Sequence, residues 1–339
     1  MSTLTVIGID LAKARFQIFG ADARGKGLFN RSIQRAKVLE FLVTRPRCQV
    51  AMEACAGSHF WARKIRELGH EVKIIPARFV TPFRRGNKND AADAEAIAEA
   101  SGRPNIHFVE IKEAAQLDLQ ALHRVRERLV GNRTALCNQI RSLLGENGIY
   151  LPQGVHSVTA VLPMIHDRRE GQELSPMARE TFADLHSELL TVEEKIAIAQ
   201  RRIEAAARSD ETCVRLQTVP GVGPISATAI RAAVGNPRAF KNGRQFAAWL
   251  GLVPRHQGTG GKTKLLGISK RGNSYIRKLL VQGAHSSLLR APHRDDRRSA
   301  WSLALLERRG RSKAVVALAN RNARTIYRLL ADGTTYDAR

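Results

Sequence analysis

The sequence predicts an α/β region at the start of the chain, a pair of long helices in the middle, and a mainly α-helical, strongly basic region at the end. Three observations support this division. Apolar runs typical of strands alternate with amphipathic runs over about the first hundred residues. Helical periodicity then extends over two long stretches, and a later segment, residues 212–294, contains no Asp or Glu. We expect domains at residues 1–105, 106–210 and 211–339.

The first region has an ordered series of elements. In chain order the expected elements are strands at 3–10, 15–21 and 27–33, a helix at 36–44, a strand at 48–53, a helix at 58–68, a strand at 71–76 and a helix beginning at Asp90. Ser58 is the expected N-cap of the second helix and Gly69 is its expected stop. A three-stranded meander followed by alternating helix and strand is the ribonuclease-H-like order, in which helices cover a mixed sheet.

Four carboxylates fall where this order of elements would bring them together. Asp10 and Glu53 end two expected strands, and Asp90 and Asp93 lie three residues apart on one face of the expected helix. Such a set can hold two divalent ions about 3.5–4 Å apart, which activates a nucleophile and stabilises the leaving oxygen in phosphoryl transfer. Because these ligands are hard oxygens, Mg²⁺ is the expected ion. Each residue alone has a structural alternative as a turn or N-cap residue, and Asp90 in particular follows the turn-prone Gly86-Asn-Lys-Asn.

The charge of the chain indicates a polyanionic partner. The formal net charge is +24 and the sequence pI is near 10.9. Residues 212–294 carry fourteen Lys and Arg and no acid. A soluble surface without such a partner normally mixes both signs of charge, and this segment is too apolar and too patterned to be basic disorder. We therefore expect the segment to approach nucleic-acid phosphates closely.

The middle region is expected to hold two long helices, at about residues 106–144 and 176–208, joined by an irregular segment. Two such helices predict an antiparallel coiled-coil arm. The arm can be a spacer between domains, or it can serve dimerisation or brace a nucleic acid. The residues leave these alternatives open.

A glycine-containing turn follows the arm. Val219-Pro-Gly-Val-Gly-Pro resembles a helix-hairpin-helix motif, in which backbone N–H groups of the turn meet a DNA phosphate. Gly221 and Gly223 would permit that approach because they have no Cβ. A Gly-x-Gly turn also occurs in ordinary connections between helices. Its position inside the acid-free segment favours DNA binding.

Residues 258–261, Gly-Thr-Gly-Gly, are expected to form a flexible loop with Thr259 at its centre. The cations around it are Arg255, Lys262, Lys264, Lys270 and Arg271. A hydroxyl in such surroundings can attack a phosphodiester, because cations stabilise both the alkoxide and the crowded phosphorane. From the residues alone, a loop that only grips phosphate is the simpler interpretation.

Several classes of protein are disfavoured. The four cysteines are scattered without C-x-x-C spacing, so neither a zinc site nor a disulfide framework is expected. No apolar run approaches the ~20 residues of a membrane span, and the N-terminal residues show no signal-peptide pattern. These features favour a protein of the bacterial cytoplasm, associated with the nucleoid.

Taken together, the motifs resemble those of DEDD-type transposases of bacterial insertion sequences, the family that includes the pilin-gene inverting recombinase. The resemblance extends over nearly the whole chain. It rests on these blocks in this order: Gly8-Ile-Asp-Leu-Ala-Lys, Met52-Glu, Asn87-Lys-Asn-Asp-Ala-Ala-Asp-Ala, Val219-Pro-Gly-Val-Gly-Pro, Gly251-Leu-Val-Pro-Arg, Gly260-Gly-Lys, Gly267-Ile-Ser-Lys-Arg-Gly-Asn and Val315-Val-Ala-Leu-Ala-Asn. The Gly-Gly-Lys and Ser-Lys-Arg-Gly-Asn blocks are more like the subgroup that inserts into defined target sequences.

The resemblance implies a Holliday-junction-resolvase-like N-terminal domain whose four acids correspond to Asp10, Glu53, Asp90 and Asp93. It also implies a C-terminal transposase domain with a serine nucleophile, and targeting by a structured RNA encoded within the element. The family's loop usually reads Ser-Ser-Gly-Gly or Ser-Thr-Gly-Gly, whereas this chain has Gly-Thr-Gly-Gly at 258–261. Thr259 is therefore the nearest hydroxyl that can serve as the nucleophile.

The expected function is excision and insertion of the chain's own mobile element. The acids and the Thr259 loop are expected to cooperate in one composite site, in a dimer or tetramer that joins DNA ends. One alternative is a metal-dependent junction resolvase or nuclease with no covalent intermediate. A further alternative is a non-catalytic nucleic-acid-binding protein that retains a degenerate nuclease fold. A denaturation-resistant protein–DNA adduct would distinguish the recombinase from the resolvase.

Overall fold

The computed structural model describes residues 3–84, 89–166, 174–259 and 262–337. The chain divides into two compact units, Met1–Ala114 and Ala115–Arg339. Both long helices lie almost wholly in the second unit, so the separate middle domain remains a prediction.

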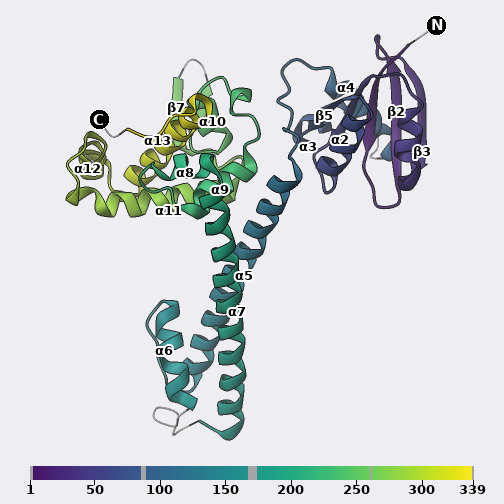
Figure 1. Cartoon of the computed structure of the whole chain (residues 1–339). Coiled ribbons are helices and arrows are strands. Elements are labelled where there is room, and N and C mark those ends of the chain that lie inside the picture. Colours follow the sequence, from purple (N-terminus) through teal and green to yellow (C-terminus); the bar gives the residue numbers. More distant parts are fainter. Residues whose placement is uncertain (1–2, 85–88, 167–173, 260–261, 338–339) are drawn as a thin grey trace. The chain divides into compact units, whose positions relative to one another are not determined.

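A five-stranded mixed sheet forms the centre of the first unit, with strand order β3-β2-β1-β4-β5 (Figure 1). Its strands are β1 (Leu4–Asp10), β2 (Arg15–Asp22), β3 (Gly27–Gln34), β4 (Gln49–Glu53) and β5 (Glu71–Ile75). The first three strands form the antiparallel meander, and β4 and β5 run parallel to β1. This sheet confirms the expected α/β class and is consistent with the ribonuclease-H-like order.

Helices cover both faces of this sheet. The helices α1 (Val38–Val43) and α2 (Ser58–Glu67) pack over buried apolar side chains such as Ile7 and Ile9 of β1. The opposite face is covered by α4 (Asp90–Ser101), with α3 (Ala77–Val80) beside it. Because side chains alternate along a strand, Gly8 and Asp10 point to the α4 face.

Local details of the first unit differ from expectation at two helix starts. The helix expected at 36–44 begins as a 3₁₀ turn, Arg35–Lys37, before α1. Ser58 was the wrong N-cap: Gly57 holds that position with φ 91°, a left-handed conformation that glycine adopts without strain. Ser58 is instead the first helical residue, and its Oγ donates to the Cys55 carbonyl at 2.9 Å.

Two long antiparallel helices run side by side through the second unit, α5 (Ala114–Glu146) and α7 (Pro176–Ser209) (Figure 1). Leu129 of α5 packs against Val192 and Ile196 of α7. Further along the pair, Arg133 and Glu193 approach to 4.0 Å. The expected pair of helices is present, and its interface is apolar with charged edges, as in a coiled coil.

The structure corrects the ends and the middle of this arm. The first helix begins at Ala114 rather than at 106, because the preceding residues are extended and Val109 donates to the Ile74 carbonyl of β5 at 2.8 Å. The segment expected to be irregular contains a further helix, α6 (Val155–His166), which carries Pro163 in its interior. Its buried Leu162 belongs to the same apolar cluster as α5 and α7.

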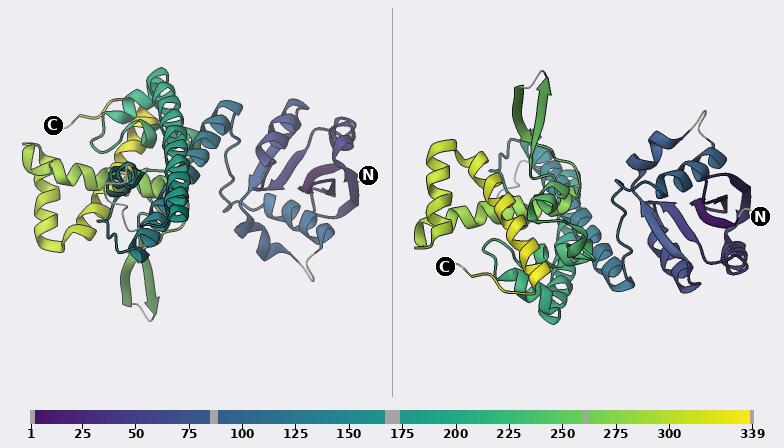
Figure 2. Two further views of the ribbon diagram at one scale, coloured as in Figure 1. Left: turned by 90° about the horizontal axis from the view of Figure 1, so that it is seen from below. Right: turned by 90° about the horizontal axis from the view of Figure 1, so that it is seen from above.

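The rest of the second unit is mainly helical, as expected. It contains α8 (Glu211–Gln217), α9 (Pro224–Ala233), α10 (Gly243–Trp249), the hairpin β6 (Pro254–Thr259) and β7 (Lys262–Ile268), α11 (Ser274–Arg290), α12 (Arg297–Arg309) and α13 (Arg311–Asp332), with 3₁₀ turns at Pro237–Ala239 and Ala291–His293. Its core gathers Phe246, Leu280, Leu318 and Ile326, all fully buried. The hairpin stands out from these helices (Figure 2).

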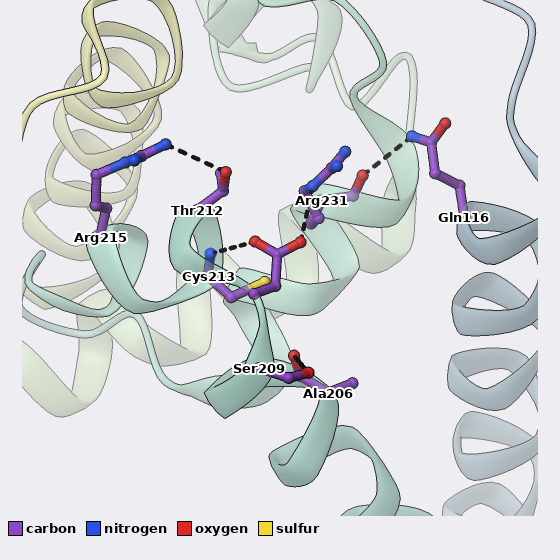
Figure 3. A network of polar contacts seen from close by, with 8 residues as sticks. Gln116, Ala206, Ser209, Thr212, Cys213, Arg215 and Arg231 are labelled. Atoms are coloured by element: carbon purple, nitrogen blue, oxygen red, sulfur yellow. Dashed lines mark hydrogen bonds and ion pairs between the residues drawn. The ribbon is translucent and has the colours of Figure 1, made fainter.

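A polar network joins the start of α5 to the junction between α7 and α9 (Figure 3). Asp210 accepts from the Cys213 N–H at 2.9 Å, which caps α8, and its other oxygen pairs with the Arg231 Nε at 3.0 Å. The Arg231 carbonyl in turn accepts from Gln116 of α5 at 3.2 Å. A cap of this kind is worth about 1 kcal/mol, and here it also fixes the angle at which α8 and α9 leave the long helix.

Among the described residues, no helix combines the length and the apolar character needed to cross a bilayer.

Candidate functional site

The parallel pairing of β1 with β4 places two of the expected acids side by side. The register pairs Gly8 with Ala51 and Ile9 with Met52. One residue further along, Asp10 and Glu53 end their strands at the same edge of the sheet. Both point to the face covered by α4, because Ala51, two residues before Glu53, packs against that helix.

Gly8 sets the distance between α4 and the sheet. A Cβ at this position would lie 2.2 Å from the Ala94 carbonyl oxygen and 2.7 Å from the Ala98 N. The backbone of α4 therefore rests directly on β1, which is possible because alanines occupy the contact face of the helix. Sequence reasoning did not assign this role to Gly8, although a glycine inside a strand signals the close approach of another backbone.

The other two acids extend this contact face beyond the strand ends. Asp90 and Asp93 lie in the first turn of α4: Asp90 is one turn before Ala94, which covers Gly8, and Asp93 directly precedes it. Asn89, and not Asp90, is the N-cap: its side chain accepts from the Ala92 N–H at 2.8 Å. The partial positive charge of the helix N-terminus stabilises carboxylates at these positions. Asp90 is thus released from the capping role that its sequence position also allowed.

The other three carboxylates act electrostatically on Asp10. The pKa of Asp10 is raised to about 6, first by burial and then by the negative charges of Asp93, Asp90 and Glu53. Arg84 opposes this rise, and its Nε forms an ion pair with Asp93. Sequence reasoning missed Arg84, whose direction depends on the chain path between α3 and α4.

The donor set fits a divalent cation by its chemistry. All four groups offer hard oxygen ligands, and with Arg84 they leave a net charge of −3 when every group is ionised. Within the described residues, no group of three or more His, Cys, Asp or Glu is arranged to hold a metal ion as it stands. We conclude that the donor atoms of these residues fit Mg²⁺ by their chemistry.

The expected glycine loop of the second unit is a β-hairpin. Arg255 lies in β6 and Lys264 in β7, and the two strands pair Gly258 with Thr263 and Thr259 with Lys262. Strand β6 ends at Thr259 and β7 begins at Lys262. The side chains of these two residues, and all of Gly260 and Gly261, lie outside the described part of the chain. A Gly-Gly pair between two extended runs is a typical hairpin turn, and this signal could have predicted the hairpin.

Two glycines fix the chain after this hairpin against the end of α10. A Cβ at Gly272 would lie 1.8 Å from the Trp249 carbonyl oxygen, and one at Gly251 would lie 2.1 Å from the Arg271 carbonyl oxygen. Both glycines have positive φ, and so does Lys270 between the two contacts, at 54°. These contacts hold the backbone of the two expected cations, Lys270 and Arg271, in a single conformation.

The turn expected to form a helix-hairpin-helix motif lies between two helices, α8 and α9, and its two glycines have different surroundings. Gly221 has φ 89°, and a Cβ there would lie 2.4 Å from the Gly283 carbonyl oxygen of α11. Gly221 thus packs inward against another helix. Gly223 is exposed at the N-terminus of α9, with no described atom within 4 Å of a Cβ built on it. The open side of this motif is therefore the start of α9.

Comparison with known families finds two matches, one in each part of the chain. The model described as Transposase IS116/IS110/IS902 family matches residues 213–299. A second transposase model, for DEDD transposases of IS110, matches residues 7–148 and so includes all four acids.

Curated relatives are similar over nearly the full length. The chain is 46% identical over 333 residues to a probable family 20 transposase of Pseudomonas aeruginosa, covering 98% of each chain. It is 40% identical over 336 residues to the transposase for insertion sequence element IS1111A of Coxiella burnetii, covering 99% of this chain and 92% of the relative. The same identity over 336 residues relates it to the transposase for insertion sequence element IS1328 of Yersinia enterocolitica, covering 99% of both.

The raised pKa of Asp10 predicts a stability effect with a defined sign. The unfolded carboxyl loses its proton near pH 3.8 and the folded one near 6, so the folded state is penalised as pH rises through this window. Asp10→Asn should therefore raise the free energy of unfolding above pH 6 in EDTA, by roughly 1 kcal/mol after allowance for solvent screening. Below pH 4 the two proteins should be equally stable.

Urea titrations from pH 4 to 8 measure this difference, with Trp249 and Trp301 replaced by Phe so that buried Trp61 reports on the first unit. Glu95→Gln, an exposed position on the same helix, is the matched control and should show no such pH-dependent gain. Added Mg²⁺ should stabilise the wild type more than Asp10→Asn. Equal stability of Asp10→Asn and wild type at pH 7 in EDTA would contradict the crowded-carboxylate site.

Proposed function

Because this chain belongs to the IS116/IS110/IS902 transposase family, it is an enzyme of DNA transposition, and we propose that Asp10, Glu53, Asp90 and Asp93 hold Mg²⁺ at the phosphodiester that it cuts. The reaction proposed is excision and insertion of the chain's own mobile element. The observation that carries the proposal is the effect of three carboxylates, from β4 and α4, on the pKa of Asp10 at the end of β1.

Each residue has a distinct part in the proposed site. Bound Mg²⁺ would polarise the phosphoryl group and stabilise charge on the attacking and leaving oxygens. Asp10 and Glu53 hold their positions through the paired strands, whereas Asp90 and Asp93 hold theirs through the first turn of α4. Arg84 offsets part of the negative charge and fixes the orientation of Asp93. Because rigid elements carry all four acids, little ordering would be required when metal and DNA bind.

For the covalent step of strand exchange, we propose Thr259 as the nucleophile. Attack of its Oγ on phosphorus would form a phosphothreonine ester and break one P–O bond of the DNA, with the Oγ proton leaving to solvent and the released DNA oxygen taking up a proton. A hydroxyl of the partner DNA end would then attack the ester, rejoin the strand and restore the threonine. The position of Thr259 at the end of β6, in a hairpin that includes Arg255 and Lys264, supports this role.

The partners proposed are DNA at the element ends and at the target, together with a structured guide RNA. The fourteen cations and the absence of acids between residues 212 and 294 support an extended polyanionic partner. An even-numbered oligomer, a dimer or tetramer, is proposed because two DNA ends must be joined in one complex. We place the reaction in the bacterial cytoplasm, at the nucleoid.

The four acids should be needed for chemistry and not for binding. Asp10→Asn and Glu53→Gln should each lower Mg²⁺-dependent cleavage of an element-end DNA by roughly a hundredfold or more, because each removes a charged ligand without changing side-chain volume. DNA affinity measured in EDTA should stay within about twofold of wild type. Cleavage of a labelled duplex carrying the element end is the readout.

Glu95→Gln again serves as the control, because it removes one charge from the exposed side of α4 and should leave cleavage unchanged. If Asp10→Asn cuts and rejoins DNA at the wild-type rate in Mg²⁺, the carboxylate cluster is not the catalytic metal site.

Thr259 substitutions test the covalent step. The β-methyl of threonine crowds attack on phosphorus and restricts χ1, so Thr259→Ser should keep or raise activity. Thr259→Ala should stop strand exchange while preserving DNA binding. Mass spectrometry of a trapped, denatured complex should find DNA on the peptide 258–262. An adduct on Ser269 or Ser274 would reassign the nucleophile. Full activity of the Ala variant with no adduct would favour the metal-dependent resolvase or nuclease.

A further inference from the structure

A large groove lies in the second unit, along one face of α13. Its volume is about 1850 Å³, and it runs between α13, the start of α10, the base of the β6–β7 hairpin and Trp301 of α12. Pockets for small ligands usually hold about 300–1,000 Å³. The groove is therefore large enough for a segment of a polymer.

The side chains that line the groove are strongly cationic. Seven of them are Lys or Arg, namely Arg244, Arg255, Lys270, Lys313, Arg321, Arg324 and Arg328. No Asp or Glu is among the described lining residues. Of these cations, only Arg328 has a carboxylate near it within the described chain, Asp332 at 3.8 Å, and both of these side chains are more than half exposed. Like charges gathered without counter-charge repel one another, so the groove is built for an anion with several charges.

The spacing along α13 explains how the groove floor forms. Lys313, Arg321, Arg324 and Arg328 recur at helical intervals on one face, with Ala317 in the gap between the first two. The opposite face buries a continuous apolar row against the core. Between the cations, Asn320 is held by donating to the Leu252 carbonyl at 3.0 Å. Packing of the apolar face thus fixes a line of positive charges along the groove floor.

The groove also has surfaces suited to bases. Trp301 is 37% exposed at its rim, and the Arg321 guanidinium lies 4.8 Å from the centre of the Trp301 ring. On the hairpin wall, Leu265 is 63% exposed. An aromatic ring beside a row of cations is the combination that binds single strands, because bases stack on the ring while phosphates meet the cations. A duplex keeps its bases stacked inside and would leave Trp301 without a partner.

We propose that this groove binds a single-stranded segment of nucleic acid, with its phosphates along α13 and a base on Trp301. The inference rests on the proposed function only in taking the polyanion to be a nucleic acid, and it adds the strand form and the residues that bind it. Single strands arise on both partners proposed above, as unpaired loops of a structured RNA and as DNA ends opened for exchange.

The test uses the full chain in EDTA, with labelled DNA and RNA single strands of about 20 nucleotides and a duplex of the same length. Lys313→Gln combined with Arg324→Gln should weaken single-strand binding roughly tenfold or more, and should make the log–log salt slope shallower by about 1.4, the value for two lost phosphate contacts. Arg308→Gln with Arg309→Gln, at exposed sites of α12 outside the groove, removes the same charge and should lower affinity much less.

Trp301 variants separate base stacking from charge. Trp301→Ala should weaken single-strand binding about tenfold while duplex binding hardly changes, and Trp301→Phe should restore most of the loss. Tight binding of either DNA or RNA single strands supports the proposal, and the preference between them identifies the source of the segment.

The proposal is overturned if the groove pair of variants binds like the α12 pair, or if duplex binds as tightly as single strand and Trp301→Ala has no effect. Asp10→Asn should bind the single strands as tightly as the wild type does. The binding measurements therefore test the groove separately from the catalytic proposal.

Discussion

Direct packing of the α4 backbone on Gly8 of β1 is the contact on which the candidate active site depends. The contact has no room for a side chain, since even a Cβ would overlap the Ala94 carbonyl. It sets the height of α4 above the sheet, and so it determines how far Asp90 and Asp93 lie from the strand ends that carry Asp10 and Glu53. The cost of gathering four carboxylates appears in the raised pKa of Asp10, and Arg84 relieves only part of it. We propose that a site held this way binds a divalent cation, because a bound positive charge would offset the repulsion among its carboxylates.

Close backbone contacts through glycine recur in the second unit, where they support the opposite charge. Gly221 packs on Gly283, and Gly251 and Gly272 lock the chain between α10 and α11. These contacts allow short helices to pack around one apolar core while the cations remain on the surface. We propose that the four clustered carboxylates of the first unit serve metal binding and that the Lys and Arg of residues 212–294 in the second unit serve phosphate binding.

The sequence predicted the strands of the first unit and the pair of long helices in the second, because both follow from local pattern. That the four acids form one site remains a prediction. Strand ends are marked by Asp10 and Glu53, and i, i+3 spacing is enough to place Asp90 and Asp93 on one face.

Other features depend on contacts between elements, which local sequence pattern does not predict. Residues before Ala114 have helical character, but Val109 pairs with the edge of β5 and is extended. The helix α6 was missed because it is short and contains Pro163, and burial against α7 stabilises it. The positions of Arg84 and of the α13 cations around one groove depend on tertiary contacts, although the spacing of the latter was visible in the sequence.

We infer that α4 and the ends of β1 and β4 together form one divalent-metal site. Crystals of the chain soaked in Mn²⁺, a Mg²⁺ substitute with strong anomalous scattering, test this claim most directly. We expect anomalous peaks within ligand distance of Asp10 and Glu53, with oxygen ligands also from the first turn of α4 and with Asp93 drawn away from Arg84. An ordered α4 at saturating Mn²⁺ with no peak beside Asp10, or with the ion bound elsewhere, would contradict it.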